Sequence, residues 1–308
     1  MLRSKTGMQF RRERLELADG DFLDLDWVTS AKGREVSDDA PLVIVLHGLE
    51  GSARSGYALQ LYRELASRSL QPVGLNFRGC SGESNRLPRA YHSGETGDLE
   101  WVARLLSNRY PERPLGSVGV SLGGNVLLKY LGENGGTRNV IGAAATISVP
   151  YDLSAGADYI ERGFSRIYRA FLVRKLKRKV RAKRHVLKRD IDVRSALTAR
   201  TFREFDDAVI VPIHGFENAE DYYRRSSSNQ FLCSIEVPTL LVHSLDDPFL
   251  PRRAVPLSAG ENPYIETAIT PHGGHVGFVS GPPWSPVFWA ERTAAQFLAT
   301  RLVNRKDL

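Results

Sequence analysis

The strongest constraint on the fold is a series of short apolar segments that alternate with segments of helical periodicity. A continuous apolar run predicts a strand that is buried on both faces. Strands that alternate with helices favour a mostly parallel, doubly wound sheet with helices on both faces, which is an α/β fold. The predicted strands are 41–48, 72–79, 115–121, 140–150, 237–244 and 264–270, and the predicted helices are 57–69, 99–106, 122–131 and 288–302.

Two regions depart from this alternation. Residues 9–17 and 21–28 alternate apolar and polar side chains around a turn, which predicts an antiparallel hairpin. Residues 151–235 have few β-branched runs and many aromatic residues, so we expect a helical insertion over the carboxyl ends of the strands, where such sheets bind ligands. The predicted organisation is a core formed by residues 1–150 and 236–308, with a helical cap formed by 151–235.

The net charge of +7 is concentrated in one part of the chain. The segment from Arg166 to Arg189 holds 12 Lys and Arg residues and no Asp or Glu, so the remainder carries a net charge of −5. A basic surface that extends over the whole molecule is the usual signature of nucleic-acid binding. The charge distribution therefore does not predict a nucleic-acid partner.

Cysteine usage and hydropathy limit the setting of the protein. Cys80 and Cys233 are too few for a disulfide framework and have no zinc-type spacing. The first 20 residues lack the apolar segment of a signal peptide, and no segment approaches the roughly 18 apolar residues of a membrane span. We therefore expect a soluble protein of a reducing, cytoplasmic compartment that uses no metal and no cofactor.

Ser121 is the first candidate for chemistry. It lies in the segment VGVSLGGN between Gly119 and the pair Gly123 and Gly124, and between a predicted strand and a predicted helix. This is the setting of a nucleophile elbow, in which a serine sits on a strained turn that leaves no room for neighbouring side chains. The alternative interpretation is a helix N-cap serine in a glycine-rich turn.

A nucleophilic serine needs a base and an acid, and both are available downstream. His275 follows two glycines after the last predicted strand, and we favour it over His272 because the glycines let the loop fold over the site. Asp247 lies in a proline-bounded loop after the strand 237–244, and Asp246 stays open as an alternative acid. The chain order of nucleophile, acid and histidine is that of α/β hydrolases.

Acyl transfer also needs backbone N–H groups that stabilise the oxyanion. The loop LHGLEGS at the end of the strand 41–48 offers the amide of Leu49. The start of the helix 122–131, which follows Ser121, offers the amide of Leu122. His47 and Gly48 are expected to shape this loop rather than to react. The alternative is a glycine-rich turn that binds no ligand.

Several motifs together resemble one branch of a known superfamily. The segments LHGLEGS, NFRGCSGESNRLPRAYHSGETGD, GVSLGGN, DDPF and GGHVGF are similar to those of the YheT-like branch of the α/β-hydrolase superfamily, which is related to eukaryotic α/β-hydrolase-domain lipases and esterases. The resemblance implies an α/β-hydrolase fold with a helical cap and an ester-type substrate. It also implies Ser121 as nucleophile, His275 as general base and one of Asp246 and Asp247 as acid.

The predicted function is a cofactor-independent serine hydrolase that cleaves carboxylic esters of lipid or medium-chain acyl type. A thioesterase or an amidase would use the same triad, and a non-catalytic scaffold that binds a lipid or a partner through its cap is the alternative from another class. We expect Arg78, together with Arg89 and His92 of the motif RLPRAYHSGET, to organise the loop beneath the cap. Glu95 and Asp98 suit the first turn of the following helix.

The basic segment has helical periodicity of its own. We expect its apolar stripe to pack on the hydrolase core and its charges to remain in water. A second interpretation is that the basic face attracts an anionic membrane surface or an anionic substrate head group. Nucleic acid is disfavoured because no aromatic platform accompanies the charge. The stripe consists of Ile167, Tyr168, Phe171, Leu172, Leu176 and Val180.

Overall fold

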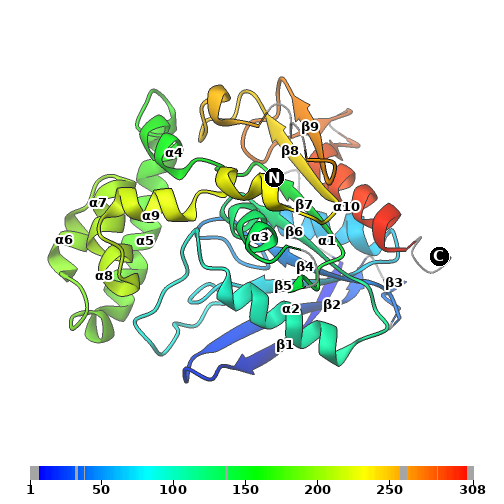
Figure 1. The fold of residues 1–308 in the computed structure, drawn as a ribbon, viewed down its shortest axis with the longest axis horizontal. Coiled ribbons are helices and arrows are strands. Elements are labelled where there is room, and N and C mark those ends of the chain that lie inside the picture. The colour runs from blue at the N-terminus through cyan, green and yellow to red at the C-terminus, as the bar shows by residue number, and fades with distance from the viewer. Residues whose placement is uncertain are drawn as a thin grey trace.

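The computed structural model describes residues 7–31, 34–37, 39–135, 138–256, 262–282 and 284–303. Its main sheet has the strand order β1-β2-β5-β4-β6-β7-β8-β9, with the short strand β3 paired to β2 (Figure 1). The pairs β1 with β2 and β2 with β5 are antiparallel, and the strands from β5 to β9 run parallel. The strands are β1 (Met8–Glu16), β2 (Phe22–Ala31), β3 (Arg34–Glu35), β4 (Leu42–Leu46), β5 (Gln71–Asn76), β6 (Leu115–Val120), β7 (Ala143–Ile147), β8 (Thr239–Ser244) and β9 (Ile265–Thr270).

Helices cover both faces of this sheet, as Figure 1 shows. One face carries α1 (Gly56–Ala66) and α10 (Trp289–Leu302), and the other carries α2 (Gly97–Arg109) and α3 (Leu122–Glu133). The alternation of side chains along β4 explains why its sequence is apolar throughout. Leu42, Ile44 and Leu46 face the α2 and α3 side, whereas Val43 and Val45 face α1 and α10.

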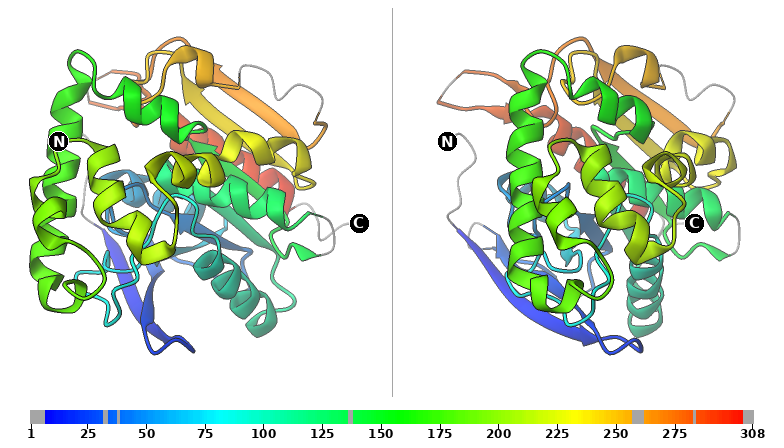
Figure 2. Two further views of the ribbon diagram at one scale, coloured as in Figure 1. Left: turned by 60° about the vertical axis from the view of Figure 1, so that its left-hand side comes forward. Right: turned by 90° about the vertical axis from the view of Figure 1, so that its left-hand side faces the viewer.

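The elements between β7 and β8 are helical in the described part of the chain and stand at one side of the sheet (Figure 2). Helices α4 to α9 share a hydrophobic cluster that is separate from the two clusters of the sheet. The last element of this segment, η2 (Ser228–Ser234), instead packs on α3. The contact is close, since a Cβ on Gly132 would lie 2.7 Å from the Phe231 Cβ. The others are α4 (Leu153–Tyr159), α5 (Ser165–Leu187), α6 (Val193–Thr198), α7 (Phe202–Ala208), α8 (Ile210–His214) and α9 (Ala219–Ser226).

The predicted α/β-hydrolase fold class, with its mostly parallel sheet, is confirmed, and the predicted hairpin is β1 paired with β2. Helix α2 is longer than the predicted 99–106, by two residues at its start and three at its end. The short strand β3 and the pair β10 (Val279–Ser280) and β11 (Val287–Phe288) were not predicted, because strands of two residues carry no periodicity. Among the described residues, no helix is both long enough and apolar enough to cross a bilayer.

The prediction for the apolar stripe of α5 is wrong for half of its members. Val180 is buried, and Leu172 and Leu176 line a pocket under the cap. Ile167 and Phe171, however, are 59% and 53% exposed, and Tyr168 is 41% exposed. The buried face of α5 passes through Val173, Val180 and Leu187, so the helix is rotated relative to the predicted stripe.

Candidate active site

Ser121 follows β6 directly and precedes α3. Its backbone has φ 54° and ψ −121°, a left-handed conformation that costs energy for any residue except glycine. A Cβ on Gly123 would lie 2.7 Å from the carbonyl oxygens of Leu46 and His47, and a Cβ on Gly119 would lie 2.6 Å from the Gly124 Cα. The glycines are therefore required by backbone that packs against backbone around the serine.

The structure brings together Ser121, His275 and Asp247 from three distant parts of the chain. The His275 Nε2 lies 2.9 Å from the Ser121 Oγ, and the His275 Nδ1 lies 2.8 Å from the Asp247 Oδ2. Asp247 is buried, and its other oxygen accepts a hydrogen bond of 2.8 Å from the Phe249 N–H. An imidazole that donates from Nδ1 to a carboxylate has its Nε2 lone pair free to accept the serine proton.

The neighbouring Asp246 makes different contacts. Its Oδ1 accepts hydrogen bonds from the N–H groups of Gly273 and Gly274, at 2.9 and 2.8 Å, and its Oδ2 lies 3.3 Å from the Nδ1 of the exposed His272. Burial raises the pKa of Asp246, but hydrogen bonds, with that of Gly274 the largest, outweigh it and hold the pKa below its usual value. Asp246 thus ties down the loop that carries His275 without touching the imidazole.

One residue near the triad was missed in the sequence. His243, at the end of β8, is fully buried, and its Nε2 lies 3.6 Å from the Asp247 Oδ2. Burial lowers the pKa of His243 to about 4, so the ring is neutral at neutral pH. Its position four residues before Asp247, at the carboxyl end of a buried strand, is the signal that was available.

The loop after β4 holds one backbone N–H group free beside the serine. The N–H of Gly48 donates to the Tyr57 hydroxyl at 2.8 Å, and the N–H of Glu50 donates to the Tyr91 hydroxyl at 2.8 Å. Between them, the N–H of Leu49 has no hydrogen-bond acceptor among the described residues. The loop also lies against Ser121, because a Cβ on Gly48 would be 3.1 Å from the Ser121 Cβ.

Leu122, the second predicted oxyanion donor, and His47, the histidine expected to shape the loop, lie at positions compatible with these predictions. Leu122 is the first residue of α3, and its N–H likewise has no acceptor in the described part of the chain. His47 is fully buried: its Nε2 accepts from the Phe77 N–H at 3.2 Å, so its Nδ1 donates to the Gly48 carbonyl at 2.8 Å. Burial lowers the pKa of His47 to about 4, which keeps this ring neutral.

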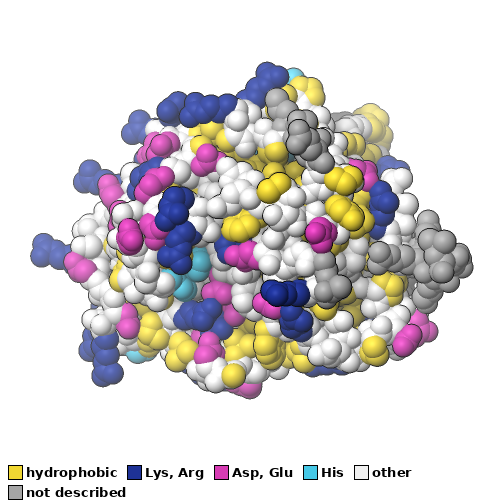
Figure 3. All heavy atoms as spheres, viewed as in Figure 1, with side chains coloured by type: hydrophobic (Ala, Val, Ile, Leu, Met, Phe, Trp, Pro, Cys, Tyr) yellow, Lys and Arg dark blue, Asp and Glu magenta, His cyan; other side chains and the backbone are white. Residues whose placement is uncertain are grey.

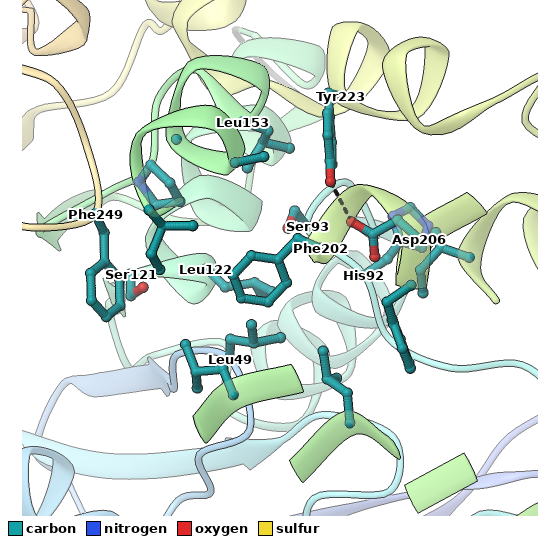
Figure 4. Close-up of a pocket in the computed structure, with 18 of the residues that line it drawn as sticks. Leu49, His92, Ser93, Ser121, Leu122, Leu153, Phe202, Asp206, Tyr223 and Phe249 are labelled. Atoms are coloured by element: carbon teal, nitrogen blue, oxygen red, sulfur yellow. Dashed lines mark hydrogen bonds between the residues drawn. The ribbon is translucent and has the colours of Figure 1, made fainter. Parts of the chain in front are cut away.

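A pocket that is partly open to solvent lies between Ser121 with His275 and the cap (Figure 4). Its walls are mostly apolar. Figure 4 shows Ser121 at one end and a polar group of His92, Asp206 and Tyr223 at the other, with Phe202 between them. The Tyr223 hydroxyl donates to the Asp206 Oδ2 at 2.7 Å, and burial raises the pKa of Asp206 to about 7.

Helix α5 connects the cap to the loop after β4. Its Lys175 Nζ donates to the Glu50 carbonyl at 2.9 Å, and its Lys179 Nζ lies 2.8 Å from the Glu50 Oε1 and 3.0 Å from the Cys80 Sγ. Burial lowers the pKa of Lys179, but Cys80 and Glu50 outweigh it and raise the pKa above its usual value. The cap therefore holds the loop of Leu49 through charged contacts.

The arginines of the motif RLPRAYHSGET and its surroundings form ion pairs. Arg78 is buried and pairs with Asp98 through two contacts of 2.8 Å, and Arg89 pairs with Glu95 at 2.5 Å. The Glu95 Oε1 also accepts from the N–H of the first residue of α2 at 3.1 Å, whereas Asp98, inside that helix, is engaged by Arg78. The ring of His92 lies beneath the cap.

One group has side chains that metals use. His92, Glu95 and His214 offer ligand atoms within 4.8 Å of one another, as judged from the described residues. The Glu95 carboxylate is engaged by Arg89, and the His92 Nδ1 accepts from the Gly94 N–H at 3.1 Å, so the neutral ring carries its proton on Nε2. A cation needs a lone pair at that position. These contacts do not favour a metal ion at this group.

A nucleophile elbow, an acid and a histidine in this chain order, at the carboxyl edge of a mostly parallel sheet, define the α/β-hydrolase class. The family model described as alpha/beta hydrolase fold matches residues 41–282, and the chain belongs to this family. The superfamily expected from the motifs is thereby confirmed.

Two relatives and one solved structure are similar to this chain. The chain is 41% identical over 294 residues to the protein named putative esterase YheT of Escherichia coli, and the match covers 94% of this chain and 85% of that protein, which confirms the resemblance to the YheT-like branch. It is 32% identical to the phospholipase ABHD3 of Bos taurus, over 99% of this chain and 75% of that protein. The structure of the Pyrococcus furiosus esterase Pf2001 superimposes with a TM-score of 0.61, covering 96% and 93% of the two chains at 16% identity, which shows the likeness of the folds alone.

Proposed function

We propose that the chain is a serine hydrolase that cleaves carboxylic esters of lipid or medium-chain acyl type. The observation that carries this proposal is the continuous hydrogen-bonded series from the Ser121 Oγ through His275 to Asp247, with contacts of 2.9 and 2.8 Å. A serine hydroxyl becomes nucleophilic when an imidazole held by a carboxylate can accept its proton. The names of the relatives, an esterase and a phospholipase, support the choice of an ester.

Each residue has a defined task in the proposed mechanism. The His275 Nε2 takes the proton of the Ser121 hydroxyl as the Oγ attacks the ester carbonyl carbon. The N–H groups of Leu49 and Leu122 donate to the oxyanion of the tetrahedral intermediate, and each such donor contributes about 10²- to 10³-fold to the rate. The leaving alcohol takes the proton from His275, and water then cleaves the acyl-enzyme with His275 again as the base. Asp247 stabilises the imidazolium at each stage.

The lining of the pocket favours a substrate with an apolar acyl group. The side chains of Leu172, Leu176, Phe202 and Ile210 line it, and they come from three cap helices rather than from the sheet. Burial of each methylene in such a pocket contributes about 0.8 kcal/mol. A medium-length acyl chain therefore gains affinity that a short chain such as acetate cannot.

Two experiments test the proposal. A fluorophosphonate probe should label the native chain at one residue, and labelling that persists in Ser121→Ala would contradict the assignment of the nucleophile. Hydrolysis of p-nitrophenyl esters of graded acyl length should then show kcat/KM rising from acetate to the medium-chain esters. A chain that neither takes the probe nor hydrolyses any of these esters would favour the non-catalytic scaffold instead.

Thioesters and amides pass through the same tetrahedral oxyanion, so the triad alone does not choose among them. Parallel assays of an acyl ester, the matching acyl thioester and the matching anilide should show the highest kcat/KM for the ester. A higher value for the thioester would replace the esterase proposal by a thioesterase with the same three residues.

A further inference from the structure

Helix α5 carries an exposed stripe that begins at its N-cap and follows one face of the helix. We call the residues Phe164, Ile167, Phe171, Arg174 and Arg178 the outer stripe. Their spacing of three and four residues places them on a single face. The first three side chains are 72%, 59% and 53% exposed, and both arginines are exposed as well. The outer stripe is thus apolar over its first two turns and cationic over the next.

The described part of the molecule leaves this stripe uncovered. Val173, Val180 and Leu187 form the buried face on the opposite side of α5. Within the described ranges, no carboxylate lies within 4.0 Å of Arg174 or Arg178. Figure 2 (right) shows α5 as the long helix at the outer side of the cap, with no element in front of it.

We propose that the outer stripe docks on the surface of an anionic lipid bilayer. A helix that lies in the plane of a membrane surface places apolar side chains among the acyl chains and cationic side chains beside the lipid phosphates. The outer stripe has both groups on the same face. The exposed apolar end anchors the cap, and the arginines select for anionic lipid.

A second copy of the chain fits the stripe less well. The exposed apolar residues Phe164, Ile167, Tyr168 and Phe171 offer roughly 450 Å² if a large side chain presents about 200 Å² in full. A stable protein interface needs about 800 Å² on each partner. Self-association through this face would also bring its arginines close to those of the other copy, where like charges repel. A lipid surface has neither restriction.

The docked surface would lie beside the pocket. Tyr168, next to the outer stripe, packs on Phe249 with ring centroids 5.3 Å apart, and Phe249 stacks on His275 at 4.1 Å. One turn further along α5, Leu172 lines the pocket. This consequence rests on the proposed function: an ester in a bilayer would reach the triad without first passing through bulk water.

Vesicle co-sedimentation of the Ser121→Ala chain tests docking independently of catalysis. The chain should sediment with vesicles that contain phosphatidylglycerol far more than with vesicles of phosphatidylcholine alone. The double variant Arg174→Gln and Arg178→Gln should bind the anionic vesicles about 25-fold more weakly, since each arginine near an anionic surface contributes roughly fivefold. The double variant Ile167→Ser and Phe171→Ser should lose binding to both kinds of vesicle.

A matched control separates the stripe from net charge. Arg11 and Arg292 are exposed and lie outside α5, and Arg11→Gln with Arg292→Gln makes the same charge change. This control should change binding less than about twofold. Equal binding of wild type, stripe variants and control, or no binding of the wild type, would overturn the proposal. So would sedimentation velocity that shows a wild-type dimer lost in the Ile167→Ser and Phe171→Ser variant.

Hydrolysis supplies the second readout, with Ser121 restored. The stripe variants should hydrolyse a vesicle-embedded ester more slowly, in proportion to their lost binding, while cleavage of a soluble p-nitrophenyl ester and the melting temperature stay unchanged. Vesicle binding without hydrolysis of any ester would remove the proposed function and leave docking intact. Hydrolysis of vesicle-embedded ester at the wild-type rate by both stripe variants would count against docking.

Discussion

Two sides of the pocket are held by different kinds of contact. We call the sheet edge that carries Ser121 the floor, and the cap helices α4 to α9 the roof. On the floor, the elbow of Ser121 is fixed by backbone against backbone, with no space for a Cβ on Gly123. On the roof, the cap has its own hydrophobic cluster, separate from the clusters of the sheet. Helix α5 reaches the loop after β4 through Lys175 and Lys179, which contact Glu50.

This difference separates the chemistry from the access to it. Close backbone packing tolerates little displacement, so the position of Ser121 is set by the sheet together with the turn into α3. Contacts between charged side chains and loop oxygens have more freedom, and their partners lie far apart in the sequence. Changes on the floor should therefore abolish turnover or stability, whereas changes on the roof should adjust them.

The largest effect is expected at the acid of the floor. Asp247→Asn should lower kcat about 10⁴-fold, because an amide no longer fixes the imidazole in the tautomer that accepts from Ser121. Asp246→Asn is the matched control, since an amide oxygen still accepts from Gly273 and Gly274, and it should retain most of the activity. The measurement is kcat for a p-nitrophenyl ester. A larger loss in Asp246→Asn than in Asp247→Asn would show that the aspartates had been assigned the wrong way round.

Glycine substitutions extend the comparison to stability. Gly123→Ala on the floor should lower the free energy of unfolding by about 3 kcal/mol, because two carbonyl oxygens lie 2.7 Å from the new Cβ. Gly156→Ala, in the cap helix α4, meets its nearest atom, the Phe249 carbonyl oxygen, at 3.3 Å. Its cost is offset by up to about 1 kcal/mol of helix propensity. Urea unfolding measures both, and similar values would remove the distinction between floor and roof.

The floor was predictable because its signals are local. The glycines around Ser121 reflect contacts within a strand, a turn and a helix that are adjacent in the sequence. The apolar runs identify strands buried on two faces, and these fix the α/β fold. His275 was favoured over His272 from the two glycines that precede it, and its imidazole lies within hydrogen-bond distance of the serine.

The roof was not predictable to the same degree, for two physical reasons. Periodicity predicts that a helix is amphipathic, but it does not fix the rotation of the helix about its axis when a pocket and solvent both border it. The exposure of Ile167 and Phe171 was therefore missed. Pairs such as Asp206 with Tyr223 join two helices of the cap, and no pattern within either helix reports the partner. The division of tasks between Asp246 and Asp247 likewise depends on the path of a distant loop.

Asp206 offers a test of the roof through pH. Burial raises the pKa of this carboxyl to about 7, whereas an unfolded aspartate titrates at about pH 4. Between these values the folded chain holds a proton that the unfolded chain has released, so the free energy of unfolding falls as the pH rises. Relative to Asp206→Asn, the wild type should lose about 2 kcal/mol from pH 4 to pH 7, half of what a sealed site would give, because the carboxyl faces the pocket.

Tyr223→Phe sharpens this test. The Tyr223 hydroxyl donates to the Asp206 carboxylate and lowers its pKa. Loss of that hydrogen bond should move the upper end of the pH window above 7. Urea unfolding at a series of pH values measures all three chains, and a difference between wild type and Asp206→Asn that is the same at every pH would exclude a titrating carboxyl in the roof.

The smallest effect is expected where roof and floor meet. Lys179→Met leaves the Glu50 carboxylate, whose side chain is 4% exposed, without its cation, and this loosens the loop that presents the Leu49 N–H. We expect kcat to fall about fivefold, which corresponds to about 1 kcal/mol. Lys177→Met, on the same helix, is the control. Adding Glu50→Gln to Lys179→Met should recover part of the loss, because the stranded charge is removed. A loss equal to that of Lys177→Met would mean that the cap does not position the loop.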